Sequence, residues 1–217
     1  WDMPKAVKFC RELVAKKRSN PKNDILTALI EAEEDGDKLT EDELVAMIFL
    51  LIIAGYETTV HLITNAVHTL LMHPEQLERL KAEPTLMGST VEEVLRFNGP
   101  IHGTKMGYPK EDITLHGVTI PKGKPIMPLL GAANHDPSVF ENPEVFDIAR
   151  TPNKHLGFGQ GIHYCLGAPL ARMETITALR NLLARNPNLS LAIDPDKLEI
   201  QNFPGWHRLR SLPVKLR

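Results

Sequence analysis

One of the two cysteines, Cys165, lies between a glycine-rich segment and an apolar helical pattern. The segment reads Phe-Gly-Gln-Gly-Ile-His-Tyr-Cys-Leu-Gly over residues 158–167. At a helix start, the helix dipole and the unpaired backbone N–H groups favour a thiolate, which is a better metal ligand than a thiol. Glycines at 159, 161 and 167 allow the backbone to lie flat against a large planar group. The pattern predicts a ligand-binding cysteine, whereas an isolated cysteine is more often a small buried hydrophobic residue.

A second group of candidate residues lies inside a long apolar stretch that reads Ala-Gly-Tyr-Glu-Thr-Thr over residues 54–59. On a helix, Ala54, Gly55 and Thr58 share one face and leave a dent against which a flat ligand could lie. Glu57 beside them is costly to bury unless it is hydrated or hydrogen-bonded. The alternative is a packing notch, in which the Thr58 hydroxyl bonds to the Ala54 carbonyl and Glu57 faces solvent.

A third pair, Glu93 and Arg96, is spaced by one helical turn. An acid and a guanidinium at this spacing are common on helix surfaces and contribute a few tenths of a kcal/mol. The pair alone therefore has little diagnostic value.

The elements that must position these residues are mostly helical. Thr40 and Glu43 form a capping box at the start of a helix of some thirty residues, and its first half is apolar on nearly every face. The segment between about residues 134 and 153 is a proline-punctuated meander, and Asp35-Gly36-Asp37 is an expected turn. Helices are expected near residues 1–18, 24–34, 40–72, 73–81, 89–97 and 165–185, and strands near residues 113–120, 124–130, 189–193 and 209–216.

Composition excludes several classes of protein. The 217 residues are 42% hydrophobic and 24% charged, with a formal net charge of -2, which is typical of a globular chain and gives no basic surface for nucleic acid. Cys10 and Cys165 are too few for a disulfide framework or a four-cysteine zinc site, and the histidines show no zinc spacing. The longest apolar run, residues 44–54, is shorter than the roughly 20 residues that cross a bilayer, so no membrane association is expected.

Together the motifs resemble those of the cytochrome P450 family. Residues 158–167 match the signature F-G-x-G-x-H/R-x-C-x-G at every fixed position, and the continuation to Arg172 is characteristic of bacterial members. Residues 54–59 are similar to the A/G-G-x-D/E-T-T motif, and Glu93 with Arg96 to the E-x-x-R helix. The motifs occur in the family's order, and the resemblance extends from about Asn20 onward.

This resemblance implies the C-terminal half of the cytochrome P450 fold, mainly α with small antiparallel β-sheets, with a long central helix, a meander and a cysteine-ligand loop. It implies haem b as the cofactor, with Cys165 as the proximal ligand of the iron and His163 close to a haem propionate. Glu57 and Thr58 become the acid–alcohol pair that relays protons during dioxygen activation. Glu93 and Arg96 become a structural lock. The remaining residues expected against the haem are Ala54, Gly55, Phe158, Gly159, Gly161 and Gly167.

The activity implied is that of a monooxygenase that inserts one oxygen atom from O₂ into a small organic, apolar substrate. Its electrons come from NAD(P)H through a ferredoxin or flavodoxin-type donor with its reductase, and its expected location is cytoplasmic. The resemblance places six residues near the substrate pocket: Met47, Leu50, Leu51, Ile101, His102 and Trp206.

Three other functions compete with this one. A peroxygenase driven by H₂O₂ is disfavoured because such an enzyme can dispense with the Glu57–Thr58 pair. A non-catalytic haem-binding or sensor fragment is compatible with the motifs. An anion-binding loop after Gly161 is the weakest alternative, because every glycine-rich helix start offers one.

The chain departs from the family pattern at three points. Val145 stands where many members carry the arginine that completes the lock, so the third member is either absent or supplied by another residue. Lys105 stands where many bacterial members place a propionate-binding arginine, and it is the expected substitute. Family members are also about twice as long, so residues 1–217 are expected to be the C-terminal portion of one domain that cannot catalyse without its N-terminal half.

Overall fold

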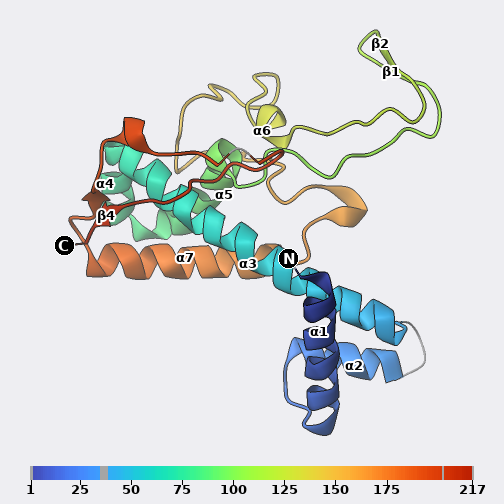
Figure 1. Cartoon of the computed structure of the whole chain (residues 1–217). Helices are drawn as coiled ribbons and strands as arrows, with labels where there is room; N and C mark the ends of the chain where they lie inside the picture. The colour runs from blue at the N-terminus through green and yellow to red at the C-terminus, as the bar shows by residue number, and fades with distance from the viewer. Residues whose placement is uncertain (1, 35–38, 202, 217) are drawn as a thin grey trace. The chain divides into compact units, whose positions relative to one another are not determined.

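The structure is a computed structural model that describes residues 2–34, 39–201 and 203–216 (Figure 1). The chain divides into two compact units, one ending at Glu57 and the other beginning at Thr58. The division falls within the longest helix, α3 (Glu41–Met72). The expected turn at residues 35–37 lies outside the described residues.

The first unit contains α1 (Met3–Ser19), α2 (Ile25–Glu34) and the N-terminal part of α3. The Thr40 backbone N–H donates to Glu43 Oε2 over 2.8 Å and the Glu43 N–H donates to Thr40 Oγ1 over 3.3 Å, so the expected capping box is confirmed. Apolar side chains at helical spacing on the three helices form a small core. Its buried members are Cys10, Val14, Ile30, Leu44, Val45 and Ile48.

The second unit is built on the rest of α3 and on α4 (Pro74–Ala82), α5 (Met87–Asn98) and α7 (Ala168–Arg185), with a 3-10 turn η1 (Pro84–Leu86) before α5. In Figure 1, α7 (orange) runs beside α5 (green), and the two helices are in contact. The buried core shared by these helices includes Leu62, Leu70, Leu80, Val91, Val94, Ile148 and Leu179.

Two short antiparallel sheets complete the second unit. Strands β1 (Ile113–Leu115) and β2 (Val118–Ile120) form a hairpin whose turn places Gly117 at φ 80°, and this hairpin lies at the end of a long excursion from the helices (Figure 1). Strands β3 (Ser190–Leu191) and β4 (Val214–Lys215) form the expected closing pair near the C-terminus.

The strand expected over residues 124–130 is wrong. Ile126 forms only an isolated bridge with Gly107, and the chain then enters the short helix α6 (Leu130–Ala133). Pro125 and Pro128 have no backbone N–H to donate to a neighbouring strand, so a continuous ladder cannot form here. The meander is confirmed, because no helix or strand lies between residues 134 and 153, all of which the structure describes.

The helix expected from Cys165 begins three residues later, at Ala168, with Gly167 as its N-cap. A 3-10 turn, η2 (Gly161–His163), precedes it, and Tyr164 leaves helical geometry with φ -50° and ψ 136°. Cys165 therefore lies just outside the helix rather than in its first turn.

Helix α3 leaves much of its apolar surface uncovered. Among the described residues it is the one helix long and apolar enough to cross a bilayer, although only 17% of its most apolar window is buried within the chain. The apolar stretch is thus longer than residues 44–54, on which the sequence argument rested. The exposed apolar side chains on α3, which include Leu50, Ile52 and Val60, require a further layer of protein to cover them.

Candidate functional site

The segment that carries Cys165 is folded against itself by backbone hydrogen bonds. The Gly159 N–H donates to the Leu156 carbonyl over 2.8 Å, and the Cys165 N–H donates to the Phe158 carbonyl over 2.9 Å. Gly159 and Gly161 have φ angles of 71° and 76°, which side chains with a Cβ rarely adopt. These two glycines are therefore required by the turn itself. The sequence had indicated only that they let the backbone lie flat against a ligand.

The exposed aliphatic side chains near the Cys165 sulfur suit a large apolar group that contains a metal ion. Ile162 is 97% exposed and Leu166 is 80% exposed, although both are aliphatic, and they flank the partly buried Cys165 in the sequence. A Cβ placed on Gly161 would meet no atom within 4 Å. A thiolate is a soft donor that suits iron, so the expected haem fits the donor type and the uncovered apolar surface. His163 is exposed on the same turn.

The structural lock is a buried and densely hydrogen-bonded polar group in the second unit. Glu93 is 0% and Arg96 is 1% exposed, and the Arg96 Nε and Nη2 atoms each lie 2.8 Å from a Glu93 carboxylate oxygen. The remaining Arg96 donors bond to three meander carbonyls. These belong to Asn134, Pro143 and Val145, at 2.8–3.1 Å. The guanidinium therefore fixes the path of the meander.

Arg150 is the third member of the lock. Its Nε lies 3.1 Å from Glu93 Oε1, and its other nitrogens donate to the carbonyls of Glu141, Asn142 and Val145 at 2.7–3.1 Å. The missing arginine side chain at position 145 is thus replaced by one five residues later, which reaches back to the Val145 backbone. Arg150 was not among the predicted lock residues, although it is the one arginine among residues 134–153.

A different part of the second unit joins the segment after α5 to the C-terminal segment. Ile101 and Trp206 form an antiparallel bridge, and the His102 N–H donates to the Gly205 carbonyl over 2.9 Å. Asn65 on α3 donates to the carbonyls of Asn98 at 3.0 Å and His207 at 2.9 Å. Three of the six expected pocket residues, Ile101, His102 and Trp206, are therefore brought together, and no sequence pattern points to Asn65.

The His102 ring stacks on the His207 ring, with centroids 4.6 Å apart and planes inclined by 10°. Burial lowers the pKa of His102 to about 4, and the charges that His207 and His135 carry when protonated act in the same direction. Burial also lowers the pKa of His207. Both rings are therefore neutral near pH 7 and present a flat, uncharged surface.

The other three expected pocket residues, Met47, Leu50 and Leu51, lie on the part of α3 that belongs to the first unit. Ala54, Gly55 and Glu57 follow on the last turn before the division, and Thr58 is the first residue of the second unit. The structure keeps all of them on one unbroken helix, as expected. Ala54 and Gly55 are exposed, whereas Glu57 and Thr58 are half-buried, and a Cβ on Gly55 would meet no atom within 4 Å.

Lys105, the expected propionate-binding residue, is exposed near the start of the excursion that carries the β1–β2 hairpin. In the part of the chain that the structure describes, no group of three or more His, Cys, Asp or Glu side chains has the geometry of a metal site.

Comparisons with known proteins agree with these features. A family model described as "Cytochrome P450" matches residues 3–201. Cytochrome P450 CYP107DY1 of Priestia megaterium is 49% identical over 210 residues, which are 96% of this chain and 50% of that protein. Cytochrome P450 monooxygenase PikC of Streptomyces venezuelae is 42% identical over 210 residues, with coverage of 96% and 50%.

Among solved structures, P450BioI in complex with an acyl carrier protein ligated to hexadec-9Z-enoic acid matches with a TM-score of 0.90 and 46% identity. The match covers 98% of this chain and 54% of that one. The chain thus spans about half the length of the relatives that it matches.

Proposed function

The chain belongs to the cytochrome P450 family, whose members carry haem, and on that premise we propose that it forms the haem-ligating and oxygen-activating part of a monooxygenase. The observation that carries the proposal is Cys165, held at the end of a folded glycine loop and flanked by uncovered aliphatic side chains. The N-terminal half that the relatives possess would cover this surface and the apolar face of α3. We propose a cytoplasmic location as well.

In this proposal the Cys165 sulfur holds the haem iron, and the loop around Gly159 and Gly161 keeps the backbone clear of the ring. His163 and Lys105, both exposed, are the proposed partners of the haem propionates. Bound haem supplies the redox chemistry by which dioxygen is reduced with electrons from an NAD(P)H-dependent ferredoxin or flavodoxin-type donor.

Glu57 and Thr58 are the proposed proton-handling residues. They are adjacent in sequence and half-buried on α3, which supports a role for the Glu57 carboxylate and the Thr58 hydroxyl in carrying protons between solvent and the site. The same pair argues against an enzyme driven by H₂O₂ alone, because that reaction does not need a proton delivered to dioxygen.

The substrate that we propose is a small, mostly apolar organic molecule. The stacked, neutral His102 and His207 rings and the bridged Ile101 and Trp206 provide one wall of suitable chemistry. The related P450BioI was solved with a fatty acyl group on an acyl carrier protein, which is consistent with an apolar substrate. A non-catalytic haem-binding role remains the second candidate, and it predicts no substrate-dependent consumption of NAD(P)H.

Thr58→Ala in the complete protein, reconstituted with haem and an electron donor, is expected to uncouple the reaction. The methyl group cannot relay a proton, so a several-fold larger share of the electrons should leave as H₂O₂ and correspondingly less product should form. The measurement is H₂O₂ and product formed per NAD(P)H consumed.

Thr64→Ala is the matched control, because Thr64 lies on the same helix and its hydroxyl donates to the Val60 carbonyl over 2.8 Å. Its coupling should equal that of the unmodified protein. Equal coupling in both variants would contradict the role of Thr58, whereas an absence of turnover in the unmodified protein would favour the non-catalytic alternative.

A further inference from the structure

The carboxylate next to the lock, Glu92, has partners of its own. Glu92 and Glu93 are neighbours on α5, and only Glu93 bonds to the meander lock. Glu92 instead accepts two hydrogen bonds from Arg172. The Nε atom donates to Oε1 over 2.6 Å, and the Nη2 atom donates to Oε2 over 2.8 Å. This bidentate pair joins α5 to the second turn of α7, the helix that follows the cysteine loop in the chain.

The N-terminal end of the loop is tied to the same carboxylate through His155. The Gly157 backbone N–H donates to His155 Nδ1 over 3.0 Å, so Nδ1 carries no proton and the ring is the Nε2–H tautomer. His155 Nε2 lies 2.9 Å from Glu92 Oε2 and therefore donates to it. The His155 side chain is only 4% exposed, and its hydrogen bond from the Gly157 N–H holds the residue before Phe158.

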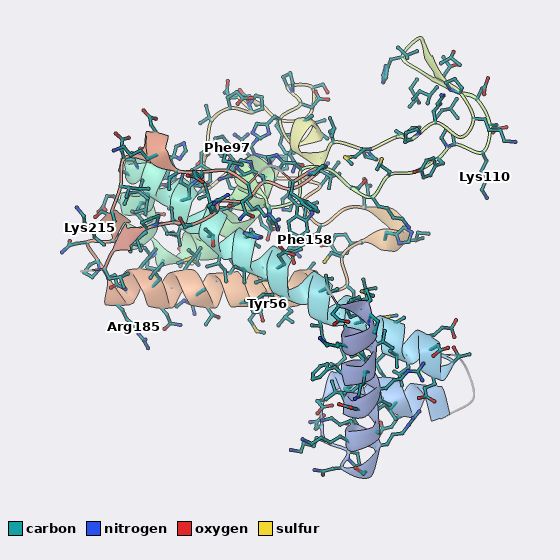
Figure 2. All side chains as sticks on the ribbon, viewed as in Figure 1. Tyr56, Phe97, Lys110, Phe158, Arg185 and Lys215 are labelled. Carbon is teal, nitrogen blue, oxygen red and sulfur yellow. The ribbon has the colours of Figure 1, made fainter. Side chains whose placement is uncertain are left out.

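The C-terminal end of the loop is tied through Arg172. Its Nη1 donates to the hydroxyl of Tyr164, the residue before Cys165, over 3.2 Å. The guanidinium carbon also lies 4.6 Å from the centroid of the Phe158 ring, within the range of a cation–π contact. Phe158, labelled in Figure 2, is in turn bonded through its carbonyl to the Cys165 N–H.

The charges in this group are stable over the working pH range. Burial alone would raise the pKa of Glu92, but hydrogen bonds from Arg172 and His155 outweigh it and lower the pKa to about 2. The same hydrogen bond raises the pKa of Arg172. Glu92 is therefore a permanent anion that orients two donors at once.

We propose that Arg172, anchored by Glu92, is a positioning residue that fixes the direction of the Cys165 sulfur by holding Tyr164 and Phe158. This inference rests on the proposed function only in that Cys165 is taken as the haem ligand. The group of Glu92, His155 and Arg172, here called the loop clamp, acts on the ligand loop, whereas the Glu93 lock acts on the meander.

The test compares Arg172→Met, Arg172→Lys and Arg180→Met in the complete haem-loaded protein. Arg180 lies on the same helix and is exposed, so it controls for loss of a charge from α7. Arg172→Met keeps a long side chain but removes every polar contact and the cation–π contact. Arg172→Lys restores the charge opposite Glu92, but it cannot bond to both carboxylate oxygens and to Tyr164 together.

Two readouts are used. The first readout is the absorbance spectrum of the reduced protein with CO, in which the band near 450 nm gives the family its name. Compared with the unmodified protein, Arg172→Met should shift a several-fold larger share of this absorbance to a shorter-wavelength form. Arg172→Lys should be intermediate and Arg180→Met unchanged. The second readout is hydrogen–deuterium exchange of the backbone amides at residues 157–165, which should quicken several-fold in Arg172→Met and stay unchanged in Arg180→Met.

Tyr164→Phe should not disturb the fold, because it removes a single hydrogen bond. It should change both readouts in the same direction as Arg172→Met, but by a smaller amount. Combining Glu92→Gln with Arg172→Met should add little to Arg172→Met alone, because the two residues act as one unit. Unchanged exchange at residues 157–165 in Arg172→Met would overturn the proposal. If the unmodified protein lacks the 450 nm band, the proposed function fails, and the exchange readout still decides whether the clamp holds the loop.

Discussion

Arg96→Ala is expected to lower the free energy of unfolding by about 3–5 kcal/mol, the range found when one partner of a buried ion pair is removed. The substitution leaves the buried Glu93 carboxylate with one guanidinium instead of two. It also removes the donors for three meander carbonyls and opens a cavity where a fully buried side chain stood. Because domains are stable by only about 5–15 kcal/mol, this loss is a large fraction of the total.

The measurement is urea-induced unfolding of the complete haem-loaded protein at neutral pH. Arg150→Ala should cost less, about 1–3 kcal/mol, since its side chain is partly exposed and Arg96 still neutralises Glu93. Arg79→Ala is the control, because Arg79 pairs with Asp147 at 3.2 Å on the surface and should contribute at most about 1 kcal/mol. Equal losses for Arg96→Ala and Arg79→Ala would contradict the lock.

Cys165→Ala is expected to remove both the 450 nm band of the reduced protein with CO and the oxygenase activity. An alanine side chain offers no donor, and any water or imidazole that replaces the sulfur lacks the electron donation that favours O–O cleavage. The glycine loop itself should persist, because its hydrogen bonds are made by backbone atoms. Haem affinity should fall with the loss of the iron–sulfur bond.

Cys10→Ala provides the matched control for this second prediction. Cys10 is the other cysteine of the chain and is buried in the core of the first unit, where it acts as a small hydrophobic residue. This variant should retain the full 450 nm band at a modest cost in stability. A band that survives in Cys165→Ala, or that is lost in Cys10→Ala, would show that the ligand is assigned to the wrong residue.

Much of the fold was predictable from local patterns. Helical periodicity and the Thr40–Glu43 capping box located α3, and proline and glycine positions marked the hairpin and the meander. The family, the mainly helical fold with small antiparallel sheets and the C-terminal coverage were confirmed by the comparisons. The strand over residues 124–130 failed because its alternating pattern was read without weighing the donors missing at Pro125 and Pro128.

The contacts that position the site were less predictable, because they join residues far apart in sequence. Nothing in the sequence pairs Arg150 or Arg172 with an acid, yet they bond to adjacent carboxylates on α5. Asn65 connects three segments through backbone carbonyls, which have no sequence signature. Tertiary hydrogen bonds of this kind depend on packing that local periodicity does not encode. The roles assigned to Cys165, Glu57 and Thr58 stay predictions until they are measured.

The central claim is that the Cys165 sulfur binds the haem iron. X-ray absorption at the iron edge tests it most directly, because sulfur is distinguished from nitrogen and oxygen among the nearest neighbours of the metal. In the complete haem-loaded protein, we expect one sulfur neighbour that is retained in Cys10→Ala and absent in Cys165→Ala. An iron surrounded only by nitrogen and oxygen in the unmodified protein would contradict the claim.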